Sequence, residues 1–342
     1  MKIIKNLAAP IQKYRYTLQI VFALIVIWIG IEFHLFITYL ESNGTGTFFE
    51  RPPGVDSFLP ISSLMSIYYW ILSGILHNAH PAGVFILIAV LSLSWIFGKS
   101  FCSWICPIGT LSEYIADFGD KVQKKLFKKV YKIPRFLDYP LRSLKYLIFG
   151  FFAYAIFTMS AATLKEFLDG SYNIVSDVKM YYFFADITSF SLKVIGILFL
   201  LSIFIRGFWC RYLCPYGALL GIMTLLTPNK ITRNADTCTD CGKCSLVCPS
   251  RIKVDKVKTV ISDECTTCML CVDACPVNDT LQLQNIINKK RVPKRIVAFG
   301  IIIIFLVVTG IGMLTGNWQN NVTKEEYLQH FENLEQIDHL TN

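Results

Sequence analysis

Two runs of cysteine with the spacing C-x2-C-x2-C-x3-C-P constrain this chain more than any other feature. They comprise Cys238, Cys241, Cys244 and Cys248 before Pro249, and Cys265, Cys268, Cys271 and Cys275 before Pro276. Such a run wraps three thiolates around part of a four-iron cubane and turns the fourth thiolate toward a second cluster. The sequence therefore predicts two [4Fe-4S] clusters, one held by Cys238, Cys241, Cys244 and Cys275 and the other by Cys265, Cys268, Cys271 and Cys248.

Other chemistries could use the same cysteines. Paired C-x2-C motifs also build structural zinc sites, but zinc would leave each run with surplus sulfur and would not explain the proline after both fourth cysteines. Thiolate ligation fits the tight spacing better than disulfides do, and it implies a reducing compartment. No C-x-x-C-H sequence occurs, which argues against c-type haem attachment.

The rest of the chain is apolar, with 54% hydrophobic and only 17% charged residues. Nearly uncharged stretches of about 18 residues or more can cross a hydrocarbon core of about 30 Å as helix. Five spans are expected, at residues 16–40, 82–98, 141–161, 190–206 and 296–315. Residues 58–76 are expected as a re-entrant or interfacial helix, because their aromatic residues suit the headgroup region.

The predicted fold is an α-helical membrane bundle of about five transmembrane helices plus the re-entrant or interfacial helix, with an inserted two-cluster ferredoxin-like α+β domain. The expected parts are a membrane domain, the cytoplasmic ferredoxin-like domain, a last transmembrane helix and an external acidic tail. Their residue ranges are 1–228, 229–288, 289–316 and 317–342.

Orientation follows from the positions of Lys and Arg, since cationic loops stay cytoplasmic. If the N-terminus is inside, five of the 33 Lys and Arg residues lie on or near the outside and the other 28 lie inside. The sequence therefore predicts a multi-pass protein of the bacterial inner membrane, with a cytoplasmic N-terminus and a periplasmic C-terminus. The basic segments 121–135 and 289–295 are interpreted as contacts with the lipid bilayer, not with nucleic acid.

The remaining four cysteines form a repeat. Cys102 and Cys106 in FCSWICPIG recur 108 residues later as Cys210 and Cys214 in WCRYLCPYG. Cysteines at i and i+4 are expected on one helix face, with the proline ending the helix at the cytoplasmic end of the bundle. Four thiolates brought together in this way would suit one further iron–sulfur or metal centre. Buried structural thiols and a transient redox dithiol are the alternatives.

The two kinds of cysteine motif, in this order, resemble the NapH, MauN and NosR group of membrane polyferredoxins. The resemblance covers roughly residues 15–316. It implies quinol-linked electron delivery to periplasmic reductases or maturation systems, and thus an electron-transfer subunit of a quinol dehydrogenase-like oxidoreductase complex. An assembly factor that reduces or handles a metal or cofactor for a periplasmic enzyme is the alternative.

A quinone site would need groups that accept protons as electrons depart. The candidates lie near or inside apolar segments, where ionisable groups are costly and often functional. They are Glu32, His34, Asp56, His77 and His80. Because the ferredoxin clusters and the family's usual acceptors lie on opposite sides of the membrane, a partner subunit carrying haem, flavin or further clusters is expected.

Overall fold

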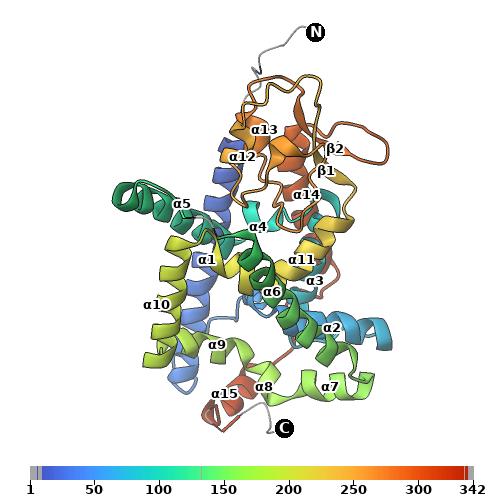
Figure 1. Ribbon diagram of the computed structural model, residues 1–342. Helices are drawn as coiled ribbons and strands as arrows, with labels where there is room; N and C mark the ends of the chain where they lie inside the picture. Colours follow the sequence, from blue (N-terminus) through green and yellow to red (C-terminus); the bar gives the residue numbers. More distant parts are fainter. Residues whose placement is uncertain (1–5, 7–9, 132, 335, 338–342) are drawn as a thin grey trace. The chain divides into compact units, whose positions relative to one another are not determined.

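A computed structural model describes residues 6, 10–131, 133–334 and 336–337, and in these residues the chain is mostly helical with one two-stranded sheet (Figure 1). The chain forms two compact units, each built from three segments. Unit 1 consists of residues 1–23, 90–149 and 195–304. Unit 2 consists of residues 24–89, 150–194 and 305–342. The ferredoxin-like segment thus belongs to the same unit as the repeated cysteine pairs.

Five long helices contribute residues to both units, and they overlap the five segments expected as spans. They are α1 (Gln12–Glu41), α3 (Pro81–Phe97), α6 (Arg135–Phe157), α10 (Ser189–Phe204) and α14 (Lys294–Leu314). The apolar side chains of α1 and α14 are largely exposed: only 17% of the most apolar window of α1 and 28% of that of α14 is buried inside the protein. Such surface needs an apolar surrounding, which identifies a membrane protein.

Within the described residues, α1 and α14 are each long and apolar enough to cross a membrane alone. Two more spans result if the bent pairs, α6 with α7 (Ala161–Asp169) and α9 (Ser176–Ala185) with α10, each count as one. The bends within these pairs are 104° and 80°. At 17 residues, α3 is shorter, so the expected number of five stays a prediction.

Unit 1 contains the elements around the cysteines, most of them short and one of them, α5, 21 residues long. They are α4 (Phe101–Trp104), α5 (Pro107–Phe127), the π-helical turn η2 (Trp209–Leu213), α11 (Pro215–Leu226), β1 (Asn229–Arg233), α12 (Lys243–Leu246), η3 (Val254–Lys256), α13 (Leu270–Ala274) and β2 (Leu281–Asn285). The two strands pair antiparallel, with Ile231 opposite Leu283 and both side chains buried. The strands thus enclose both cysteine runs between them in sequence, as a ferredoxin-like segment requires.

Unit 2 contains mainly short helices. They are η1 (Pro53–Phe58), α2 (Pro60–Ser73), α7, α8 (Ser171–Ile174), α9 and α15 (Lys324–Glu332). The segment expected as re-entrant or interfacial is α2, which has 14 residues. At about 1.5 Å per residue it is too short to cross a bilayer.

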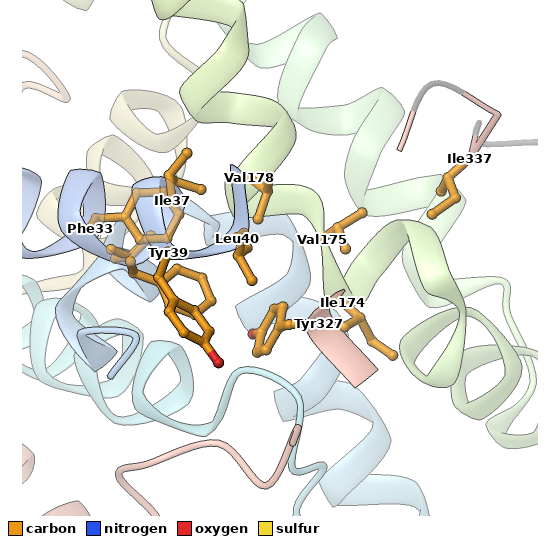
Figure 2. Close-up of a cluster of buried hydrophobic side chains, with 11 residues drawn as sticks. Phe33, Ile37, Tyr39, Leu40, Ile174, Val175, Val178, Tyr327 and Ile337 are labelled. Atoms are coloured by element: carbon orange, nitrogen blue, oxygen red, sulfur yellow. The ribbon is translucent and has the colours of Figure 1, made fainter. Parts of the chain in front are cut away.

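A buried hydrophobic cluster joins the parts of unit 2 (Figure 2). Phe36 and Leu40 of α1 pack there with Val178 of α9 and with Tyr327 of α15, whose ring meets the Phe36 ring edge-on at 5.2 Å. Thr323 caps α15 by accepting a hydrogen bond from the Glu326 amide. The acidic tail is thereby packed into unit 2 as far as it is described. Residues 335 and 338–342 of the tail lie outside the described residues.

Candidate metal centres

The two ferredoxin-type cysteine runs fold into matching loops in unit 1. In the first loop Asp240 and Gly242 flank Cys241 with φ angles of 49° and 69°, and in the second Thr267 and Met269 flank Cys268 with 49° and 64°. Left-handed residues on both sides of a cysteine curl the backbone tightly around one point. Each loop then continues into a one-turn helix, α12 or α13.

A cavity in unit 1 is lined by Cys238, Cys241, Cys244 and Cys275. The first three come from the first run and the fourth comes from the end of the second run. The Arg233 side chain also lines this cavity, and its Nε donates a hydrogen bond of 3.1 Å to the Val257 carbonyl. Four cysteines around one cavity provide the four thiolate ligands that a [4Fe-4S] cluster requires.

The other four cysteines of these runs lie near one another as well. Burial raises the pKa of the Cys271 thiol, and the charges of the neighbouring Cys268, Cys265 and Cys248 thiols raise it further. The Ile252 amide donates a hydrogen bond of 3.4 Å to the Cys248 sulfur. Cys248, from the first run, is therefore placed with three cysteines of the second.

The two loops differ in their exposure to solvent. Burial raises the pKa of the Cys268 thiol to about 11. Cys241 is exposed, and a hydrogen bond from the Lys243 amide lowers its pKa. Since metal ligation requires thiolates, the buried loop depends more strongly on a bound metal to keep its sulfur atoms deprotonated.

Among the described residues, no three His, Cys, Asp or Glu side chains are grouped tightly enough to hold a metal ion. A single tetrahedral ion would need such a group, with each sulfur about 2.3 Å from it. A four-iron cluster spaces its thiolates around a larger core.

The repeated cysteine pairs have the same local geometry in both copies. Cys106 and Cys214 are the N-cap residues of α5 and α11, and each is followed by proline at the first helical position. Their sulfur atoms accept hydrogen bonds from the amides of Gly109, at 3.4 Å, and Gly217, at 3.3 Å. Amide donors at a helix N-terminus stabilise negative charge on sulfur.

This geometry corrects one expectation. The two cysteines of a pair do not share one helix: Cys102 lies in the short helix α4, whereas Cys106 caps the next helix, α5. The proline therefore begins a helix as well as ending one, because its missing N–H is tolerated at the first helical position. In the second copy, Cys210 lies in the π-helical turn η2 and Cys214 caps α11.

The glycine in each CPxG sequence permits a close approach of backbone to backbone. A Cβ atom on Gly109 would lie 2.0 Å from the Cys102 carbonyl oxygen, and one on Gly217 would lie 3.2 Å from that of Cys210. The turn that brings the two cysteines of a pair together thus requires glycine strictly in the first copy and less strictly in the second.

Two of the candidate quinone residues form part of a buried ion network in unit 2. The Arg51 guanidinium pairs with both Asp56 and Asp177. His80 lies 3.0 Å from the Asp56 carboxylate through Nδ1 and donates from Nε2 to the Asn173 carbonyl at 2.7 Å. Burial disfavours the charged forms, but Arg51 and His80 outweigh it and lower the pKa of Asp56.

Sequence reasoning did not identify Arg51 or Asp177 as members of this network. Asp177 lies 126 residues after Arg51, and nothing in the local pattern of either residue indicates the pairing. Both carboxylates and the guanidinium are almost fully shielded from solvent. The polar atoms of Asp56 and His80 are therefore bonded inside the network.

The other three candidates lie elsewhere in unit 2. His77 borders a cavity of ≈ 430 Å³ and lies 2.9 Å from Asp169 through Nε2. His34 is exposed and bonds the Tyr181 hydroxyl at 2.7 Å. Glu32 is half-buried on α1. The structure therefore does not bring the five candidates together in one site.

Comparison with known proteins matches these two cysteine regions separately. The family described as "4Fe-4S binding domain" matches residues 79–128 and 190–234, which contain the repeated cysteine pairs. The family described as "4Fe-4S dicluster domain" matches residues 230–276. No solved structure matches the chain.

Among curated relatives, "Putative electron transport protein YccM" of Escherichia coli K12 is 42% identical over 92% of this chain and 88% of its own length. "Methylamine utilization ferredoxin-type protein MauN" of Methylorubrum extorquens is 26% identical over 66% of this chain and 73% of its own. "Ferredoxin-type protein NapH" of Haemophilus influenzae is 29% identical over 55% and 63%.

The fold, the cysteine sites and these matches define a class, the ferredoxin-type electron transport proteins of the membrane, which carry [4Fe-4S] clusters. Within that class, the chain belongs to the NapH, MauN and NosR family, together with YccM. The resemblance found in the sequence motifs is thereby confirmed.

Proposed function

We propose that this protein is a membrane-bound relay that carries electrons between quinol, or a cytoplasmic donor, and a partner redox protein. The observation that carries the proposal is the cavity lined by Cys238, Cys241, Cys244 and Cys275. It joins cysteines of both runs, which is the crossed arrangement of a two-cluster ferredoxin. When bound, such clusters accept and release one electron at a time.

In this proposal the chain's cysteines hold three centres. Cys238, Cys241, Cys244 and Cys275 hold the first cluster, and Cys265, Cys268, Cys271 and Cys248 hold the second. The repeated pairs, Cys102 with Cys106 and Cys210 with Cys214, hold a third. The matching N-cap geometry of Cys106 and Cys214 supports the third centre, because both sulfur atoms already receive backbone N–H groups.

The membrane arrangement is also proposed. The helices α1, α3, α6, α10 and α14 would cross the bacterial inner membrane, with the N-terminus and the ferredoxin-like segment cytoplasmic and the C-terminus periplasmic. The support is the concentration of Lys and Arg in the segments that would face the cytoplasm. In this orientation, a periplasmic acceptor needs a partner subunit that carries haem, flavin or further clusters.

The cavity beside His77 favours quinol as the donor. Its walls include the apolar side chains of Leu76, Leu168 and Ile174, and its polar side holds the His77 and Asp169 pair. Lys165 and Glu326 also line it. A cavity that combines apolar walls with titratable side chains suits a hydrophobic donor that must release protons.

The test is the reduction of the clusters in anaerobically purified protein by a short-chain quinol, followed through the visible absorbance. We expect quinol to bleach part of the absorbance that dithionite bleaches, and His77→Asn to slow that bleaching while His34→Asn does not. Full dithionite bleaching with no response to quinol would remove quinol as the donor. A colourless protein that binds only zinc would overturn the electron relay itself.

A further inference from the structure

Lys99 is a buried cation next to the first of the repeated cysteine pairs. Helix α3 ends at Phe97, and Gly98 then turns the chain with a φ of +68°. This turn directs Lys99 into unit 1, where only 3% of the residue is exposed. Three residues later the chain reaches Cys102.

Within the described residues, the Lys99 ammonium makes no hydrogen bond and has no carboxylate within salt-bridge distance, since the Glu264 carboxylate is bonded to Lys145. The carboxylate whose charge acts on Lys99 is Glu264, and it is already paired with Lys145 and Arg142. Taking an unpaired ammonium out of water carries a large desolvation penalty. A charge of this kind requires a compensating anion.

Besides Glu264, the groups whose charges would interact with the Lys99 ammonium are three of the four thiols of the repeated pairs. They are Cys102, Cys210 and Cys214. As neutral thiols they would give Lys99 no counter-charge. As thiolate ligands of an iron–sulfur or other metal centre, they would form a group with a net negative charge.

We propose that Lys99 is the counter-charge of the metal centre held by Cys102, Cys106, Cys210 and Cys214. This inference rests on the third centre proposed above. Lys99 acts through the centre as a positioning charge: it stabilises the reduced, more negative state over the oxidised state, and so raises the reduction potential.

A difference between the two copies of the repeat supports this assignment, because only the first copy has a lysine at this position. The position 108 residues after Lys99 is Gly207, which has no side chain to carry a charge. Arg206, one residue earlier, is turned to Asp117 and Asp120. The centre therefore receives a lysine from the first copy and none from the second.

The first test compares Lys99→Met, which removes the charge at similar length, with Lys99→Arg, which keeps it. The readouts are iron per chain and the midpoint potential of the paramagnetic signal that disappears when all four cysteines of the repeated pairs are changed to alanine. We expect Lys99→Met to shift that potential downward or to lose that signal, and Lys99→Arg to restore it. An unchanged potential and iron content in Lys99→Met would overturn the inference.

Lys230→Met is the matched control. Lys230 is also buried, but its ammonium donates to the carbonyl oxygens of Thr224 and Leu225, and the thiol that acts on it is Cys265. Its removal should leave the signal of the repeated pairs in place. An equal downward shift of that signal in both variants would mean that any buried cation of unit 1 has the same effect, which contradicts a specific role for Lys99.

A double-mutant cycle supplies an independent test through protein stability. In the natural background, Lys99→Met leaves the anionic centre without its counter-charge and should lower the melting temperature. In the four-alanine background Lys99 has no anion to face, so the same substitution should raise it. Loss of stability or of accumulation in both backgrounds would show a purely structural role and overturn the inference.

The outcomes separate the two proposals. Full iron content in the four-alanine variant would show that the third centre does not exist, and both proposals would fail. Loss of iron in that variant, with no effect of Lys99→Met on potential or iron, would leave the third centre intact and reject only the role of Lys99.

Discussion

The two units contain buried cations with opposite surroundings. In unit 2, Arg51 is enclosed by the carboxylates of Asp56 and Asp177, so its charge is balanced by the chain itself. In unit 1, Lys99 is as deeply buried, but the one carboxylate that acts on its charge, Glu264, is already paired with Lys145 and Arg142, and the other groups that act on it are thiols. The difference indicates that unit 2 is electrostatically complete as a polypeptide, whereas unit 1 becomes complete only when its cysteines hold metal.

Removal of the metal should have the largest effect, and it should be confined to unit 1. Metal-bound thiolates link segments of unit 1 that are far apart in sequence, and structural metal sites contribute on the order of 10 kcal/mol to folding. We expect chelation under reducing conditions to speed amide hydrogen exchange in α4, α11 and α13 by several orders of magnitude. Exchange in α8 and α9, next to the Arg51 network, should stay slow. Equal acceleration in both units would contradict the comparison.

Substitution of Arg51 should have the next largest effect, and it should reverse the pattern. Arg51→Met removes the only cation paired with Asp177 among the described residues and leaves Asp56 with His80 alone, and breaking a buried ion pair in this way costs roughly 3–5 kcal/mol of stability. The melting temperature should fall, while iron per folded chain stays at the natural value. Arg206→Met is the control, because its carboxylate partners are partly exposed and such pairs contribute about 0–1 kcal/mol. Iron loss in Arg51→Met would show that unit 2 also depends on the metal centres.

A smaller effect should distinguish the two copies of the repeated motif. In Gly109→Ala the new methyl group would overlap the Cys102 carbonyl, whereas in Gly217→Ala it would only be crowded against that of Cys210. We expect Gly109→Ala to destabilise by about 1–3 kcal/mol and to lower iron content, and Gly217→Ala to cost under about 1 kcal/mol. Thermal melting and iron analysis of both variants would check the order, and a greater loss in Gly217→Ala would contradict it.

The smallest effect concerns acid pH. Because the pKa of Asp56 is lowered in the folded protein, its ion pair stabilises fully above the ordinary aspartate pKa of about 3.9. This contribution is lost as the pH falls below that value toward the folded pKa. The difference in melting temperature between the natural protein and Asp56→Asn should therefore be larger at pH 7 than at pH 3.5. The acid sensitivity of the clusters is common to both proteins and cancels, so a constant difference would contradict the role of Asp56.

The sequence located the long helices well because their signal is local. The expected spans 16–40 and 296–315 correspond to α1 and α14 within a few residues. Apolar stretches determine such helices without reference to the rest of the chain. The bends of α6 into α7 and of α9 into α10 were not predicted, because a break of a few residues in an apolar stretch leaves the composition almost unchanged.

The electrostatic partners were not predictable, because ion pairing depends on contacts between distant segments. Asp56 and His80 were candidates for a quinone site because ionisable groups beside apolar segments are costly. Only the fold shows that Arg51 and Asp177 bond or balance them. Lys99 carried no signal in the sequence beyond its place before FCSWICP, since its burial and its thiol neighbours depend on segments more than 100 residues apart.

The most direct test of the account is iron and acid-labile sulfide per chain in anaerobically purified protein, compared with the variant that has alanine at Cys102, Cys106, Cys210 and Cys214. Three [4Fe-4S] centres would give about twelve iron atoms in the natural protein and about eight in the variant. The same iron content in both proteins would show that the repeated pairs hold no iron–sulfur centre, and would contradict the claim that unit 1 is completed by metal at that site.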